Sequence, residues 1–202
     1  MVHVHFRIFL LFAVFLCLAS GCSTVEISAN LIYENAAAPG GATGELLLAR
    51  AVERHSALKL PGGKALLGRV KNSGTEIVTA DSAVDWVGLA MTEELTAAGF
   101  RVTNVPELPR GVPRGVNVAI LGVGVEQEDN FIMVTTTANL RVEVEVWRDG
   151  ANVRTFSAES EAEEIGVDRS SKPITGALMR ALQGAMRKLV PDVVRLLDTR
   201  PR

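Results

Sequence analysis

The chain has 202 residues, with 21 Lys and Arg against 23 Asp and Glu, and a formal net charge of −2 at neutral pH. This length suits one domain with its own hydrophobic core. The sequence has no basic run or patch, which argues against nucleic acid as a partner. Its two cysteines, Cys17 and Cys22, are too few for a framework of several disulfides.

The first 21 residues predict a signal peptide. An apolar run from Ile8 to Leu18 follows the lone basic Arg7 and leads into the small residues 19–21. Small residues before a cleavage point are typical of secretory signals. The run is short for a membrane span, which takes about 20 apolar residues.

Cys22 follows these small residues, and the stretch Leu18-Ala19-Ser20-Gly21-Cys22 resembles the lipobox of bacterial lipoproteins. The resemblance implies that the Cys22 thiol receives a diacylglycerol and its freed amine an acyl chain such as palmitate. Several acyl chains hold a protein firmly, whereas one alone binds marginally. Ser23, where an Asp would favour inner-membrane retention, favours the outer membrane. The alternatives are an ordinary signal peptide cut near Ala19 or Gly21, and an uncleaved helix.

After the signal, residues 22–44 are expected to be the lipidated cysteine and a tether, and residues 45–202 a single α+β periplasmic domain. Residues 25–27 and 31–33 are short strand candidates, and residues 36–41 have loop composition. The apolar stretch from Leu46 to Val52 fits either a strand or a short helix. Residues 65–79 predict a hairpin that turns at Asn72-Ser73-Gly74.

A helix is predicted from Ser82 to about Ala98. Ser82 and Asp85 match a capping box, in which side-chain oxygens satisfy free amides of the first turn. Gly99 lies where a C-terminal cap belongs, and a strand starts after it. One face carries apolar residues at three- and four-residue spacing, which predicts that it is buried: Val84, Val87, Met91, Leu95 and Ala98.

Three strands are predicted next, over residues 116–126, 131–147 and 153–165. The middle one alternates apolar residues with Arg141, Glu143 and Glu145, so one face belongs to the core and the other is wet. Asp149-Gly150 predicts a type I′ hairpin turn. The three strands therefore form an antiparallel meander. Gly122-Val123-Gly124, inside the first strand, predicts a bend or a close helix contact rather than half of a dinucleotide loop.

A second helix is predicted from about Lys172, with Pro173 at its first position. Pro191 is expected to kink or end it. Its apolar stripe comprises Ile174, Ala177, Leu178, Ala181, Leu182, Ala185, Met186, Leu189 and Val193. The order of elements predicts an α+β fold, a mainly antiparallel sheet with a three-stranded meander and two amphipathic helices packed on one face.

Residues 91–102 (Met-Thr-Glu-Glu-Leu-Thr-Ala-Ala-Gly-Phe-Arg-Val) resemble the helix-to-strand passage of the YajG-type uncharacterised lipoproteins. The start Thr24-Val25-Glu26-Ile27, the Val-Asn-Val strand at 116–118 and the order of the later elements are also similar to that family. The resemblance covers most of the chain after the signal. It implies an envelope lipoprotein with a small α+β periplasmic domain, and it supplies no catalytic residues.

Residues that could carry chemistry are few. His55 is the one histidine after the signal. A zinc site would lack the further His or Cys ligands that it usually needs, and a Ser-His-Asp triad would have only His55 as its base. We therefore expect neither enzyme activity nor a cofactor. Glu159, Glu161 and Glu163 share a strand face and could bind Ca²⁺. A solvated face that discourages edge pairing is the favoured interpretation.

Trp147 lies on the wet face of its strand with Arg141, and we expect this pair to contact a partner. The N-terminal tether could instead cover Trp147. The expected function is a non-catalytic, lipid-anchored lipoprotein of the outer membrane, facing the periplasm, that binds an envelope protein or stabilises an assembly.

The alternative function is an accessory lipoprotein of an envelope lipid or solute transport system. Its apolar ligand would lie between the sheet and the terminal helix. Small residues of that helix, Ala177, Ala181, Gly184 and Ala185, would leave the room that such a ligand needs.

Overall fold

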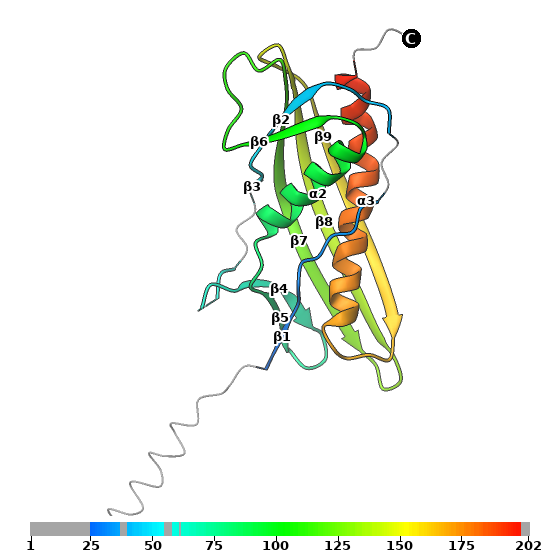
Figure 1. The fold of residues 1–202 in the computed structure, drawn as a ribbon. Coiled ribbons are helices and arrows are strands. Elements are labelled where there is room, and N and C mark those ends of the chain that lie inside the picture. The colour runs from blue at the N-terminus through cyan, green and yellow to red at the C-terminus, as the bar shows by residue number, and fades with distance from the viewer. Residues whose placement is uncertain (1–24, 37–39, 55–57, 61, 199–202) are drawn as a thin grey trace, which may run out of the picture.

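A computed structural model describes residues 25–36, 40–54, 58–60 and 62–198; the predicted signal peptide, Cys22 and His55 lie outside these residues. The described part forms one large sheet with two helices (Figure 1). The elements in chain order are β1 Glu26–Ser28, β2 Glu45–Ala49, β3 Val52–Glu53, β4 Ala65–Val70, β5 Glu76–Thr79, α2 Ala83–Ala97, β6 Arg101–Val105, β7 Arg114–Asp129, β8 Val134–Arg148, β9 Ala151–Gly166 and α3 Lys172–Leu197.

The predicted meander is the longest part of the sheet. β7 pairs antiparallel with β8, and β8 with β9, along almost their whole lengths. The β8–β9 turn has φ of 50° at Asp149 and 79° at Gly150, the left-handed backbone that a type I′ turn requires. A register shift between Ile120 and Gly122 marks a bulge, and a bulge bends its strand. A bend is one of the two outcomes that the sequence predicted for Gly122-Val123-Gly124.

The rest of the sheet corrects one prediction, because the sheet is mixed rather than mainly antiparallel. The second edge of β7 pairs in turn with β2, β3 and β4, all of them parallel to it. β6 is parallel to β2, and β1 is parallel to β5. The β4–β5 hairpin is antiparallel, as predicted. Parallel neighbours need long crossover connections, so strands far apart in sequence meet here, and local patterns do not specify their direction.

Helix α2 begins and ends where the sequence placed its caps. The Ser82 hydroxyl accepts a hydrogen bond from the Asp85 amide at 3.2 Å. At the other end Gly99 has φ of 110°, its amide bonds the Thr96 carbonyl, and the Phe100 amide bonds the Leu95 carbonyl. This pair of hydrogen bonds is a Schellman motif, which stops the helix and turns the chain into β6.

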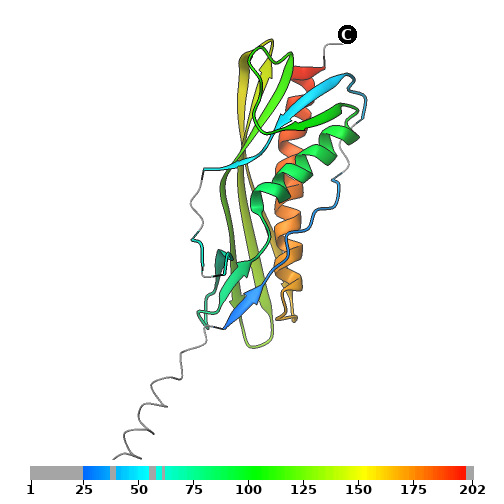
Figure 2. The ribbon, with the colours of Figure 1, turned by 60° about the vertical axis from the view of Figure 1, so that its left-hand side comes forward.

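Helix α3 lies along β8 and β9, on the same face as α2 (Figures 1 and 2). Every residue of its predicted stripe is buried. The helix continues through Pro191 to Leu197, so the proline does not end it. Pro191 and Arg187, four residues earlier, are both exposed. Water can therefore bond the Arg187 carbonyl, which the proline leaves without its helical N–H partner.

Residues 25–36 lie within the predicted tether; β1 pairs with β5, and the chain after it runs along the two helices (Figure 1). The Trp86 indole donates to the Ile32 carbonyl at 2.7 Å. The Tyr33 hydroxyl and the Ala36 amide both donate to the carboxylate of Glu94, which is 2% exposed. Burial and the Glu94 hydrogen bond raise the pKa of the Tyr33 hydroxyl, which stays neutral. Neither described helix is both long and apolar enough to cross a membrane.

Candidate functional site

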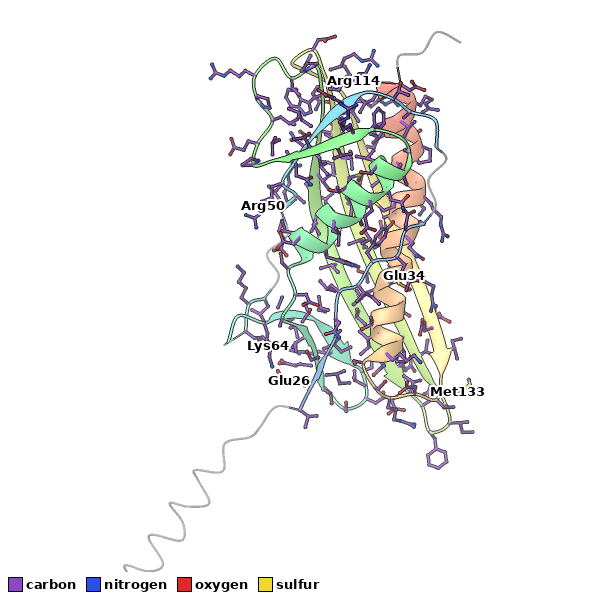
Figure 3. The ribbon with its side chains drawn as sticks, in the orientation of Figure 1. Glu26, Glu34, Arg50, Lys64, Arg114 and Met133 are labelled. Atoms are coloured by element: carbon purple, nitrogen blue, oxygen red, sulfur yellow. The ribbon has the colours of Figure 1, made fainter. Side chains whose placement is uncertain are left out.

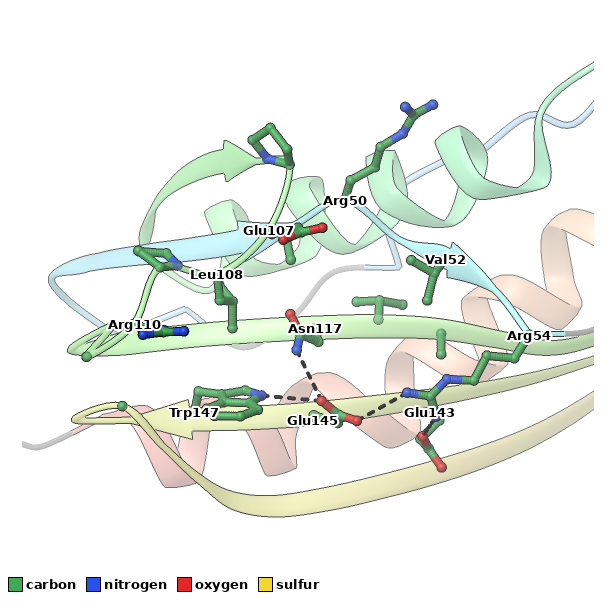
Figure 4. Close-up of a pocket in the computed structure, with 17 residues that line it drawn as sticks. Arg50, Val52, Arg54, Glu107, Leu108, Arg110, Asn117, Glu143, Glu145 and Trp147 are labelled. Carbon is green, nitrogen blue, oxygen red and sulfur yellow. Dashed lines mark hydrogen bonds and ion pairs between the residues drawn. The ribbon is translucent and has the colours of Figure 1, made fainter.

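A groove of about 500 Å³ opens on the sheet face that points away from α3. Its floor consists of outward-facing side chains of β7 and β8, among them Asn117 and Trp147 (Figure 4). One wall is the loop 106–111 between β6 and β7, and the other is the segment 49–54 that carries β3. The period of two in β8 creates this floor, because Val142, Val144 and Val146 are fully buried on the other face.

Glu145 is the centre of a hydrogen-bond network on this floor (Figure 4). One of its carboxylate oxygens accepts from the Asn117 amide at 3.1 Å and from the Trp147 indole at 3.3 Å. The other accepts from the Arg54 guanidinium at 3.2 Å. A second nitrogen of Arg54 bonds Glu143, so one arginine clamps two carboxylates of β8.

These partners fix the charge of the network. The Asn117 hydrogen bond, followed by those from Arg54 and Trp147, holds the pKa of Glu145 below its usual range. Both Glu145 oxygens are occupied and the group stays ionised at neutral pH. A general acid or base needs a pKa near the operating pH, so this arrangement suits binding better than proton transfer.

The loop wall is fixed to the β8–β9 turn. The Asp149 amide donates to the Pro113 carbonyl at 3.1 Å, and the Gly150 amide to the Val112 carbonyl at 2.9 Å. A Cβ at Gly150 would lie 2.8 Å from the Gly111 Cα, so the close approach of turn and loop requires a glycine. The groove therefore has a rigid wall rather than a free loop.

The structure separates the two residues that the sequence predicted as partner contacts. Trp147 is half-buried and lines the groove. Arg141 lies further along β8, outside the groove lining, and forms an exposed ion pair with Glu159 at 3.1 Å. Trp147 and the loop 106–111 line the same groove, whereas Ile32 of the tether bonds Trp86 of α2 on the helix face, so this part of the tether does not cover Trp147.

The carboxylates of β9 follow the predicted alternation. Glu159, Glu161 and Glu163 are exposed, while Glu164 is half-buried and pairs with Arg180 of α3. Among the described residues, no group of three or more His, Cys, Asp or Glu side chains is placed to hold a metal ion.

Sequence reasoning missed Arg54, Asn117 and the loop. Arg54 follows the two-residue strand β3 and meets Glu143 across 89 positions of sequence, so no local pattern reveals the pair. The loop does carry a signal, because prolines at 106, 109 and 113 form a stiff stretch between two strands.

A second groove, of about 420 Å³, lies between α2 and the β2–β6 strand pair. Its lining is mostly apolar and includes Leu48, Val105 and Leu89, which is 53% exposed. The space between the sheet and α3 is filled instead. Ala177, Ala181 and Ala185 are fully buried, and a Cβ at Gly184 would lie 2.2 Å from the Ser160 hydroxyl.

No family model and no curated protein matches the chain. Among solved structures, it is similar to protein XCC0632 of the DUF330 family from Xanthomonas campestris, at 11% identity and a TM-score of 0.53, over 85% of this chain and 95% of that one. This likeness shows a shared fold.

Two further solved structures are more distant. An uncharacterised protein aligns at 9% identity and a TM-score of 0.47, over 84% of this chain and 99% of that one. The lipoprotein GNA1162 from Neisseria meningitidis aligns at 15% identity and a TM-score of 0.31, over 73% of this chain and 99% of that one. None of these structures is named as a YajG-type protein, so that resemblance stays a prediction.

Proposed function

We propose that this chain is a non-catalytic lipoprotein of the bacterial envelope, anchored through Cys22, that binds a partner protein in the groove around Trp147. The observation that carries the binding role is a half-buried tryptophan on the floor of a rigid-walled groove, beside ion-paired Arg54. Tryptophan and arginine are enriched among the few residues that dominate the binding energy of protein interfaces.

The chemistry of the groove favours an extended polypeptide as the occupant. The floor offers an indole face next to fixed carboxylates, and the loop wall adds the apolar Pro106, Leu108 and Pro109 and the cation of Arg110. A peptide supplies both apolar side chains and backbone N–H and C=O groups that such a mixed surface recognises.

The test isolates the lipidated chain from envelope membranes after crosslinking in cells. The chain should recover one partner in stoichiometric amount. Trp147→Ala should weaken that recovery about thirtyfold, since losing a tryptophan hot spot costs about 2 kcal/mol. Val153→Ala is the matched control, because Val153 is exposed on the next strand and does not line the groove. Equal recovery with both variants would show that the groove is not the binding site.

The anchor has a separate test. Mass spectrometry of the N-terminal peptide from envelope-extracted protein should show a chain that starts at Cys22 and carries a diacylglycerol and one further acyl chain. Cys22→Ala should abolish both additions. A wild-type chain that starts elsewhere, or that carries no lipid, contradicts the proposed anchor and its outer-membrane location.

The second candidate function is an accessory lipoprotein of a lipid or solute transport system. The mostly apolar groove between α2 and the β2–β6 pair favours it, although this is not the sheet–α3 position that the sequence suggested. Lipid extraction and mass spectrometry of purified protein should then find a bound apolar molecule, and Leu89→Asp should remove it. Trp147→Ala should leave it in place, which separates the two candidates.

A further inference from the structure

The β7–β8 turn presents an apolar surface at one end of the molecule. Five exposed apolar side chains gather there, three in the turn and two at and after the end of β9. Their exposed fractions are 100% for Phe131, 75% for Ile132, 50% for Met133, 60% for Ile165 and 71% for Val167. The register of β8 and β9 brings the two groups together, since Val134 pairs with Gly166. We refer to these five residues as the apolar tip.

Polar contacts within the turn and with neighbouring segments hold the apolar tip in place. The Asn130 amide donates to the Met133 carbonyl at 2.8 Å and closes the turn. Arg169 donates to both carboxylate oxygens of Asp129, at 2.9 and 3.1 Å, and Asn72 of the β4–β5 turn donates to the Asp129 carbonyl at 2.6 Å. The exposed apolar side chains therefore stand on a braced turn, and rigid presentation reduces the entropy lost on binding.

The N-terminal end of the described chain lies at the same end of the molecule. β7 runs toward the apolar tip, β4 is parallel to it, β5 runs back, and β1 is parallel to β5. The chain before β1 therefore comes from the side of the tip. Figure 3 shows Glu26 and Met133 at this common end.

The register also shows how far Glu26 and the apolar tip lie along the direction of the strands. Glu26 is level, through Glu76 and Arg69, with Glu126 of β7. Phe131 lies five residues beyond Glu126, and Cys22 lies four residues before Glu26. Four extended residues reach about 13–14 Å, so a lipidated Cys22 and the apolar tip can meet one plane.

Charge at this end does not suit an electrostatic contact. Lys71 is paired with Glu126 at 3.2 Å, and Arg169 with Asp129. Lys172, exposed at the start of α3, lies close enough to Asp168 to lower the pKa of that carboxyl, so it is not an isolated positive charge. A surface that attracts anionic headgroups would need unpaired basic residues. The apolar side chains are therefore the groups that recognise the occupant, and the contact should be insensitive to salt.

We propose that the apolar tip inserts into the headgroup–acyl boundary of the bilayer that holds the Cys22 acyl chains. This contact rests on the proposed lipid anchor and adds a second point of attachment to it. Two points fix the direction of the meander relative to the membrane, whereas one flexible anchor does not. Trp147 lies thirteen residue steps after Val134 along β8, so the groove stands about 40 Å from the membrane.

The test uses the full lipidated chain in phosphatidylcholine vesicles whose acyl chains carry bromine, a short-range quencher of tryptophan. Phe131→Trp is compared with Val153→Trp, an exposed position at the opposite end of the meander. We expect quenching of about half of the fluorescence that Phe131→Trp adds, because interfacial side chains reach ~5–10 Å into this boundary. The fluorescence added by Val153→Trp should be unquenched, and high salt should change neither result.

Flotation of the same vesicles reports the anchor independently. A chain that floats while the fluorescence added at position 131 stays unquenched overturns the tip contact and leaves the anchor intact. A chain that does not float and carries no lipid overturns the anchor and the contact that rests on it. A photo-crosslinker at position 131 that captures a protein instead of lipid in intact cells also overturns the proposal, in favour of a protein interface.

Discussion

The two ends of the meander are built from the same strands but finished in opposite ways. At the β8–β9 turn, backbone hydrogen bonds tie Asp149 and Gly150 to the loop before β7, and Glu145 in the neighbouring groove is bonded by Arg54 and Asn117. At the β7–β8 turn Asp129 is bonded by Arg169, on the side of the turn that faces the body of the protein. Phe131, Ile132 and Met133 are exposed to solvent. One end hides apolar surface beneath a loop, and the other displays it.

Turn chemistry alone does not produce the second arrangement. Hairpin turns favour Gly, Asn, Asp and Ser, which supply the required backbone and bond their own main chain. Asp149-Gly150 follows this preference, whereas Phe131-Ile132-Met133 departs from it. Exposed apolar residues that gather in one patch mark interaction surfaces. The difference supports the two proposed roles, specific recognition at the groove end and contact with an apolar phase at the tip end.

The largest expected effect comes from α3, which supports both ends at once. Leu182 is fully buried in the stripe that packs on the sheet. Leu182→Asp places an unpaired charge in the core, so we expect a loss of about 4 kcal/mol or more and no cooperative unfolding transition. Arg187→Asp is the matched control, because Arg187 is exposed on the same helix. Similar melting curves for the two variants would show that α3 does not face the core.

A second prediction concerns a substitution, Gly68→Ala, that should disrupt the sheet only near the apolar tip. A Cβ at Gly68 would lie 1.6 Å from the Val125 carbonyl oxygen, where β4 pairs with β7. Gly68→Ala should therefore force these strands apart and cost about 3 kcal/mol in urea unfolding.

The control for this change is Gly122→Ala in β7, since a Cβ at Gly122 has no atom within 4 Å. This variant should be as stable as the wild type, or up to about 1 kcal/mol more stable through the reduced freedom of the unfolded chain. A Gly68→Ala protein with wild-type stability would contradict the parallel pairing of β4 and β7.

How far the sequence predicts this molecule depends on how local the determining chemistry is. The Asp149-Gly150 turn and the caps of α2 are set by residues a few positions apart. The turn, the Ser82 cap and the Gly99 cap were predicted correctly. The Asp85 carboxylate of the predicted capping box pairs with Arg50. The parallel pairing of β7 with β2, β3 and β4 joins segments tens of residues apart, so the sheet is mixed and the prediction that it is mainly antiparallel was wrong.

The same distinction holds for the two surfaces. Alternation along β8 placed Trp147 on the correct face, but Arg54 reaches the groove only through the tertiary fold. Residues 131–133 were predicted as the start of a strand because apolar runs are typical of strands. β8 instead starts at Val134, and the three residues form the apolar tip. An apolar turn and an apolar strand end look alike in sequence, and their exposure separates them.

A third prediction concerns the groove end, where the stability contributed by the Glu145 network should depend on pH. The pKa of Glu145 is held below the usual glutamate value of 4.5, so its network stabilises the fold above that pH and is lost as pH falls through the lower, folded-state pKa. Glu145→Gln should cost about 1 kcal/mol at pH 7, a typical net value for one intramolecular hydrogen bond, because the glutamine keeps one acceptor oxygen. Unfolding measured at pH 7 and at progressively lower pH should show this difference shrink below pH 4.5.

Glu161→Gln is the control for this pH dependence, because Glu161 is exposed on β9. It should behave like the wild type at every pH. A Glu145→Gln difference that stays constant as the pH falls would contradict the charged network at Glu145, and would assign its effect to side-chain packing instead.

The smallest expected effect on folding is at the apolar tip, because its side chains are not packed in the fold. Phe131 is fully exposed, so Phe131→Ser removes no buried area and should leave the unfolding midpoint of the chain unchanged.

The same change should increase the rotational freedom of the lipidated chain on vesicles, because the second attachment point is weakened. The measurement is the fluorescence anisotropy of a dye attached at position 153, which should fall. Met133→Ser, at a half-exposed position of the same turn, should act in the same direction but less strongly. A Phe131→Ser chain that unfolds more easily would mean that the turn packs on its own body and that the two ends differ less than the structure indicates.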